Sequence, residues 1–256
     1  MIGAIAGDMI GSPYEAWPIK DKDFPLRVAA FTDDTVLTVA VADALLGGGD
    51  FAACLRRFAR RYPGAGYGGS FRKWMWIDDP APYNSFGNGS AMRVSPVGFA
   101  FDTAEAVLTH ARRSAAVSHD HPEGLKGAQA TALSIFMARM GESKEAIRKE
   151  ISRRFGYDLN RSVDDIRPTY RFDITCQGSV PESIICFLDS ESWEDAVRNA
   201  VSMGGDADTM ACIAGGISQA YYGQIPAAVR DAVRAGLPAD LLQVVDRFNR
   251  AYGCRF

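Results

Sequence analysis

The sequence lacks any long uninterrupted run of apolar residues. Its amino-terminal run, MIGAIAGDMIG, is short, follows no basic segment and is interrupted by Asp8. A signal peptide has basic residues ahead of its apolar core, and a membrane-spanning helix needs about 20 mostly apolar residues. We therefore expect no signal peptide, no membrane association and a cytoplasmic protein.

Paired cysteines and an excess of basic charge are also missing. The 5 cysteines are widely spaced, with no CxxC pair, which disfavours a zinc site and is typical of small core residues in a reducing compartment. The chain has 28 basic and 31 acidic residues and a formal net charge of -3. Without a basic excess to neutralise phosphates we expect no general nucleic-acid binding, although a small phosphate-bearing ligand still fits this balance.

Common nucleotide and calcium motifs do not occur. There is no Walker A sequence, and the cluster GAGYGG at residues 64–69 neither follows a predicted strand nor opens a clear helix, as a dinucleotide-binding turn would. The acidic segment DADT at residues 206–209 lacks the mid-loop glycine and closing glutamate of an EF-hand.

Apolar residues at helical spacing dominate the chain, and alternating strand-like segments are scarce. With 47% hydrophobic residues, 256 residues and no linker-like tract, the sequence predicts a single all-α domain over residues 1–256, built as a compact multi-helix array. The expected helices lie at residues 35–46, 51–61, 103–118, 122–140, 143–155, 180–189, 192–202, 210–223, 226–236 and 238–252.

Three stretches have weak helical patterns: residues 11–31, 62–101 and 157–178. Long loops in a compact domain usually carry function or are disordered. The second stretch is rich in aromatic residues, which argues against disorder, so we expect it to be an ordered binding loop.

Two of the expected helices begin with the same group of acidic and hydroxyl residues, TDDT at residues 32–35 and GGDADT at residues 204–209. One interpretation is that each cluster is a separate, solvated helix cap. If the two helix starts meet, four carboxylates would repel one another unless cations compensate them, and such oxygen ligands suit Mg²⁺ or Mn²⁺. Four carboxylates balance two divalent cations. The ligands would be Thr32, Asp33, Asp34, Asp206, Asp208 and Thr209.

Other polar segments allow a binding role or a plain structural one. The segment YNSFGNGSAMR, residues 83–93, has glycines and amides that could cradle phosphate oxygens, and Phe86 could face a base; an ordinary loop explains it equally. In SHDHPEG, His119 and His121 lack zinc-like partners, which favours a capping or ligand-contacting histidine. Glu15 could be a surface acid.

Taken in order, GDxxG with a following Glu15, TDDT, GNGSAMR, SHxHP and GGDADT resemble the motifs of the ADP-ribosylglycohydrolases related to dinitrogenase reductase-activating glycohydrolase. The resemblance runs from residue 3 to about residue 223. It implies an orthogonal all-α array with a binuclear Mg²⁺ or Mn²⁺ centre at the bottom of an ADP-ribose cleft.

The resemblance assigns the same six residues as metal ligands and places Glu15 beside them as a mobile ligand or catalytic acid. It assigns catalysis to Glu15, Asp33 and Asp34 without deciding which is the acid or base. It implies that Gly66, Tyr67 and Gly68 form a further cleft loop, on a looser match. The implied ligand contacts are Ser85, Phe86, Gly87, Asn88, Gly89 and His119.

The implied reaction is metal-dependent hydrolysis of the bond between the anomeric carbon of ADP-ribose and an acceptor, an ADP-ribosylated protein side chain or a small conjugate. The metals would hold the hydroxyls of the distal ribose and activate a water. Two rival functions stay open: a non-catalytic ADP-ribose-binding module, and a metal-dependent phosphohydrolase that cleaves the diphosphate. The sequence decides neither the acceptor linkage, nor Mg²⁺ against Mn²⁺, nor the oligomeric state.

Overall fold

The computed structural model describes residues 1–254, and the last two residues of the predicted domain lie outside this range. The described residues form helices and loops without a β-strand, apart from one isolated bridge between Gly87 and Thr175, so the all-α prediction is confirmed. The helices are α1 (Ile2–Ala16), α2 (Asp33–Leu46), α3 (Phe51–Arg61), α4 (Gly69–Trp74), α5 (Gly89–Met92), α6 (Ser95–Ala100), α7 (Ala104–Ala116), α8 (Pro122–Arg139), α9 (Lys144–Phe155), α10 (Val163–Ile166), α11 (Cys176–Leu188), α12 (Trp193–Ser202), α13 (Ala207–Tyr222), α14 (Ala227–Gly236) and α15 (Ala239–Ala251).

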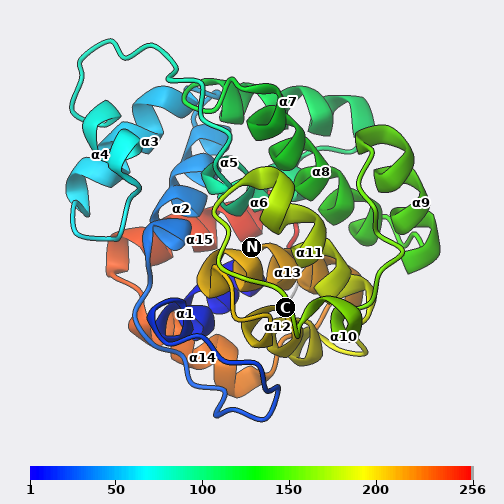
Figure 1. Ribbon diagram of the computed structural model, residues 1–256. Helices are drawn as coiled ribbons and strands as arrows, with labels where there is room; N and C mark the ends of the chain where they lie inside the picture. Colours follow the sequence, from blue (N-terminus) through cyan, green and yellow to red (C-terminus); the bar gives the residue numbers. More distant parts are fainter. Residues whose placement is uncertain (255–256) are drawn as a thin grey trace.

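Helix α13 lies in the middle of the array (Figure 1) and packs against α1, α8, α11 and α12. Every residue of this helix from Ala207 to Gln219 is buried. A helix that is covered on all sides needs small or apolar residues all round, and ADTMACIAGGISQ meets that need with Asp208 and Thr209 as its main polar exceptions. These two exceptions therefore sit in the core of the fold.

None of the described helices is both long and apolar enough to cross a membrane.

Helices α1 and α13 cross with their backbones in close contact. Gly3, Gly7 and Gly11 recur every fourth residue and so share one face of α1. A Cβ atom built on Gly7 would lie 2.0 Å from the carbonyl oxygen of Ala211, and one on Gly11 would lie 2.4 Å from that of Ala207. This stripe of glycines sets the distance between the two helices and brings the carboxyl end of α1 to the start of α13.

Gly7→Ala is therefore expected to destabilise the protein by about 3 kcal/mol, because the methyl group meets backbone that cannot rotate away. The matched control is Gly64→Ala, where an added Cβ meets nothing within 4 Å. Urea unfolding followed by circular dichroism measures both variants. Equal midpoints for the two variants would show that the α1–α13 crossing is not this close.

The three stretches predicted to be weakly helical contain more helix than expected. Helix α1 was not predicted and continues through Pro13 to Ala16; α4, α5 and α6 lie within residues 62–101. In the third stretch, α10 occupies Val163–Ile166 and α11 begins at Cys176 rather than near residue 180. The predicted helix boundaries are therefore wrong in these stretches. Glycines in α1 and prolines in α1 and α11 lower helix propensity, but tertiary packing keeps these segments helical.

Candidate metal centre and ligand cleft

The amino-terminal ends of α2 and α13 meet in the structure. Thr32 caps α2, and Asp206 is the residue before the first turn of α13. The hydroxyl of Thr209 lies 3.4 Å from Oδ2 of Asp34, so it joins the two clusters directly. The interpretation as two separate, solvated helix caps is therefore wrong for this fold, because Asp34, Asp206 and Asp208 are all buried.

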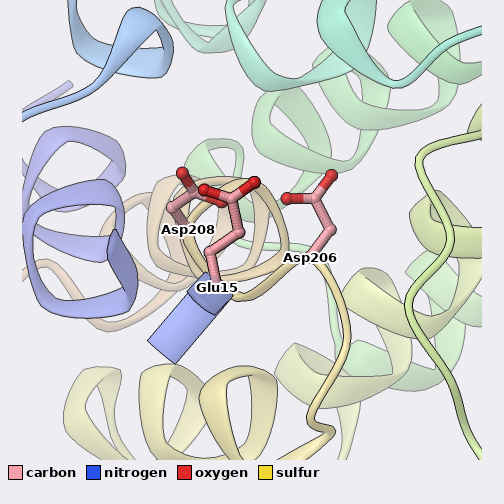
Figure 2. A group of neighbouring side chains, drawn as sticks. All are labelled: Glu15, Asp206 and Asp208. Atoms are coloured by element: carbon pink, nitrogen blue, oxygen red, sulfur yellow. The ribbon is translucent and has the colours of Figure 1, made fainter. Parts of the chain in front are cut away.

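Glu15 joins this group from the end of α1. Carboxylate oxygens of Glu15, Asp206 and Asp208 all lie within 4.8 Å of one another. Figure 2 shows the three carboxylates converging from the end of α1, the start of α13 and the loop before it. Glu15 is exposed while the two aspartates are buried, so it lies on the solvent side of the cluster.

Mutual repulsion and burial dominate the electrostatics of this cluster. Burial, followed by the charge of Asp208, raises the pKa of Asp33 to about 8 and the pKa of Asp34 well above its usual value. The same two causes raise the pKa of Asp206 well above its ordinary value and also raise the pKa of Glu15. Since a nearby cation would favour the charged form of every one of these groups, the cluster is built for positive charge.

The protein itself supplies no such cation. Among residues 1–254, none of the carboxylates of Glu15, Asp33, Asp34, Asp206 and Asp208 forms an ion pair with a lysine, arginine or histidine. Oδ1 of Asp34 is buried and has no hydrogen-bond partner among the described residues. Buried polar atoms are nearly always paired, so an orphan carboxylate oxygen points to a missing ligand. The donors are carboxylate and hydroxyl oxygens, which fit a hard divalent cation.

Asp8 supports the start of α2, a contact that the sequence does not predict. It is fully buried, and its carboxylate accepts hydrogen bonds from the backbone amides and hydroxyls of Thr32 and Thr35. These bonds fix the first turn of α2 and orient Thr32 toward the cluster. Burial, followed by the charge of Asp208, raises the pKa of Asp8 to about 7. Its signal in the sequence is its place in GDxxG, as an acid within an apolar run.

A cleft of about 330 Å³ opens above the carboxylates, within the range of small-molecule sites. All six predicted metal ligands and Glu15 line it. Of the predicted ligand contacts, Ser85, Gly87, Asn88, Gly89 and His119 also line it, as do Gly66 and Gly68 of the looser cleft loop. Phe86 is not part of the lining: its ring is 46% exposed and packs edge-on against His121. Its role as a ligand contact stays a prediction.

The loop that holds residues 85–89 is tied to the acidic cluster and to residues 174–176. The Asn88 side chain donates to Oδ2 of Asp206 at 2.7 Å. Its backbone amide donates to the carbonyl of Ile174 at 2.8 Å, and the Cys176 amide donates to the carbonyl of Phe86 at 2.8 Å. The loop is therefore held rigidly against the mouth of the cleft and against the proposed metal ligands.

The two histidines of SHDHP have different places. His121 caps α8, with Nδ1 accepting from the Glu123 amide at 3.1 Å. His119 is buried and lines the cleft. Beside it lies Arg93, a fully buried arginine that lines the cleft and that the sequence reading did not single out. In the sequence it closes the GNGSAMR motif, but nothing in that motif indicates that its side chain is buried.

Comparisons with known proteins identify related sequences and a related fold. The family model for ADP-ribosylglycohydrolase matches residues 1–255. The chain is 28% identical to ADP-ribosylhydrolase ARH3 of Homo sapiens over 94% of this chain and 90% of that protein. It is 25% identical to ADP-ribosylarginine hydrolase Tri1 of Pseudomonas putida, over 87% of this chain and 69% of that protein.

Among solved structures, the fold is similar to a chain of an ADP-ribosylglycohydrolase-related protein complex, with a TM-score of 0.75 and 25% identity. The match covers 98% of this chain and 95% of that one. The match of the family model along nearly the whole chain and the agreement in fold lead to one conclusion: this protein belongs to the ADP-ribosylglycohydrolase family.

Proposed function

We propose that this protein hydrolyses the glycosidic bond between ADP-ribose and an acceptor, and releases free ADP-ribose. The observation that carries the proposal is the cluster of Asp33, Asp34, Asp206 and Asp208 at the base of a cleft, three of them buried and none paired with a lysine or arginine of the described residues. We propose that residues 1–256 act as one domain. Its substrate would be an ADP-ribosylated protein or a small ADP-ribosyl conjugate.

The six oxygen ligands named above would hold two divalent cations, Mg²⁺ or Mn²⁺. When bound, such cations supply Lewis-acid chemistry: they fix the oxygens of a ligand and favour deprotonation of a water. Thr32 and Thr209 contribute neutral oxygens, and Asp8 keeps Thr32 in place through its hydrogen bonds. Without a cation the carboxylates repel one another, which raises the pKa of Asp34. A bound cation would offset this repulsion.

Proton transfer falls to the carboxylates that face the cleft. Glu15 lies at the solvent side of the cluster, and burial and the charge of Asp208 raise its pKa. Its place at the solvent side lets it exchange protons with water, which suits a general acid or base. In their ionised form Asp33 and Asp34 would place negative charge at the base of the cleft, and such charge stabilises an oxocarbenium-like transition state.

The loop of residues 85–89 supports the ADP-ribose side of the proposal. Gly87 and Gly89 present backbone to the cleft, and His119 packs behind them: a Cβ atom on Gly89 would lie 3.2 Å from Nε2 of His119. The lack of a side chain at both glycines lets phosphate oxygens approach this turn closely. The amides of Gly87 and Asn88 already donate to Oγ of Ser85 and to the carbonyl of Ile174, so they are not the phosphate donors. The cleft thus has the loop of residues 85–89 on one side and a group of carboxylates at its bottom. A ligand with a diphosphate and a ribose would use both.

Product identity tests this proposal. Matched peptides carrying ADP-ribose on arginine or on serine are incubated with the protein in Mg²⁺, in Mn²⁺ and in a chelator, and the products are identified by mass spectrometry. Free ADP-ribose, lost on chelation, is the expected product and names the linkage. AMP with a ribose phosphate product would instead identify a phosphohydrolase. Tight ADP-ribose binding without any product would identify a binding module.

A further inference from the structure

Arg93 is a fully buried arginine in the wall of the cleft. Only Nη2 of its side chain has partners: the carbonyl of Ser114 at 3.0 Å and the hydroxyl of Ser118 at 2.9 Å. Nε and Nη1 are buried and have no hydrogen-bond partner in residues 1–254. Burial lowers the pKa of Arg93 to about 10, so it stays cationic near neutral pH. A buried cation with unpaired N–H groups is expensive, which indicates a role beyond packing.

The hydroxyl of Ser118 connects Arg93 to His119. It accepts from Nη2 of Arg93 and lies 2.8 Å from Nδ1 of His119. The hydroxyl has one proton and two lone pairs. With one lone pair accepting from Arg93, its proton can be donated to Nδ1 of His119, which then acts as the acceptor. The opposite tautomer would place an N–H group against a hydroxyl that already accepts from a cation, and would leave the hydroxyl proton without this acceptor.

The other ring nitrogen of His119 faces the cleft. Nε2 has no hydrogen-bond partner within residues 1–254, and it lies beside the proposed phosphate loop, 3.2 Å from a Cβ built on Gly89 and 3.9 Å from one on Gly87. His119 is neutral here, because burial and the charge of Arg93 hold its pKa well below the ordinary value. A neutral imidazole has one N–H group, so fixing the proton away from Nδ1 puts it on Nε2.

We propose that Arg93 and Ser118 are positioning residues that hold His119 in the Nε2–H tautomer, so that its ring donates a hydrogen bond to an oxygen of the ligand at the Gly87–Gly89 loop. This rests on the proposed function for the identity of the ligand, ADP-ribose. The tautomer itself is a property of the ligand-free protein. Ser118 and Arg93 act through His119 and touch no reacting atom.

The first test is direct observation of the tautomer. Long-range ¹H–¹⁵N spectra of the imidazole rings in the ligand-free protein distinguish protonated from unprotonated ring nitrogens, and His119→Gln assigns the His119 signals among the three histidines. We expect a protonated Nε2 and an unprotonated Nδ1 in the wild type. In Ser118→Ala the two shifts should converge as the tautomers mix. A wild-type ring protonated at Nδ1, or an unchanged ring in Ser118→Ala, would overturn the proposal.

Ligand affinity is the second readout. Calorimetry with ADP-ribose should give about tenfold weaker binding for Ser118→Ala, the equivalent of about 1.4 kcal/mol for one lost hydrogen bond. Ser118→Thr keeps the hydroxyl and should restore binding to within about threefold of wild type. Equal affinities of the wild type and Ser118→Ala would contradict the ligand contact. If the wild type shows the Nε2–H tautomer but does not bind ADP-ribose, the proposed function fails while the tautomer assignment stands.

Matched controls separate this role from packing. Ser114→Ala removes an equally buried hydroxyl one turn earlier, which donates to the carbonyl of Ala111 and not to Arg93 or His119; it should change neither readout. Tyr83 is the alternative partner of the Ser118 hydroxyl, and Tyr83→Phe should leave the tautomer unchanged. Should Ser118→Ala not fold, Arg93→Met, which removes the donor to Ser118, should also mix the tautomers; an unmixed ring there would count against the proposal.

Discussion

Asp208→Asn is expected to lower the rate of ADP-ribose release at least about 10³-fold, which corresponds to about 4 kcal/mol of lost transition-state stabilisation. Asp208 is buried in the first turn of α13, within reach of Glu15 and Asp206. It also contributes to the raised pKa values of Asp8, Asp33, Asp34 and Asp206. The amide keeps the shape of the side chain but removes the charge that a cation needs.

The same substitution should make the metal-free protein more stable, by about 1 kcal/mol, because it relieves repulsion among buried carboxylates. Steady-state kinetics and thermal unfolding in chelator measure the two effects. The control is Glu105→Gln, the same charge change in the first turn of α7, at an exposed residue. A variant with near wild-type turnover, or one less stable than the wild type in chelator, would remove Asp208 from the proposed centre.

The metal-free protein is expected to lose stability as the pH rises from about 5 to 8. Asp8 and Asp33 have folded-state pKa values of about 7 and about 8, above the usual value near 4 in an unfolded chain. Above pH 4 the unfolded chain therefore releases protons that the folded protein keeps, and each pH step upward favours unfolding until the folded groups also ionise. We expect a loss of at least about 2 kcal/mol across this range, or about 4–8 °C in Tm.

Bound cations should reverse this trend, because they bind the ionised carboxylates of the folded state. Mn²⁺ at 1,000 times its dissociation constant should add about 4 kcal/mol, and add more at pH 8 than at pH 5. Differential scanning fluorimetry across this pH range, with chelator and with Mn²⁺, measures both curves. A metal-free Tm that rises from pH 5 to 8, or Mn²⁺ stabilisation that is largest at pH 5, would contradict the assignment of these carboxylates.

Much of the fold could be predicted from local patterns. The helices that carry regular apolar spacing and a capping residue, such as α3, α9 and α12, appear where the sequence predicts them. Helix α1 could not be recognised, because its glycines look unfavourable until the partner helix is known: their purpose is the close approach to α13, which is a property of the folded chain.

The candidate metal ligands could be predicted from residue type, because carboxylate and hydroxyl side chains are grouped at two helix starts. Repeated acid-and-threonine clusters at two helix starts indicated that the two starts could meet, and the structure brings them together around one cleft. Asp8 and Arg93 belong to the GDxxG and GNGSAMR motifs, but their burial and their contacts could not be predicted, because these depend on the folded chain. For Phe86 the sequence does not predict the environment. Its neighbours line the cleft, but its ring packs against His121, because the direction of one loop side chain depends on local packing.

The most direct test of the central claim is a titration of the chelator-treated protein with Mn²⁺. Metal uptake is followed by calorimetry, and ADP-ribose release from the peptide that the protein cleaves is measured at each point. We expect two Mn²⁺ ions per chain and activity that returns as the sites fill. In Asp208→Asn we expect neither metal uptake nor activity. Full hydrolysis before any metal is added would contradict the central claim.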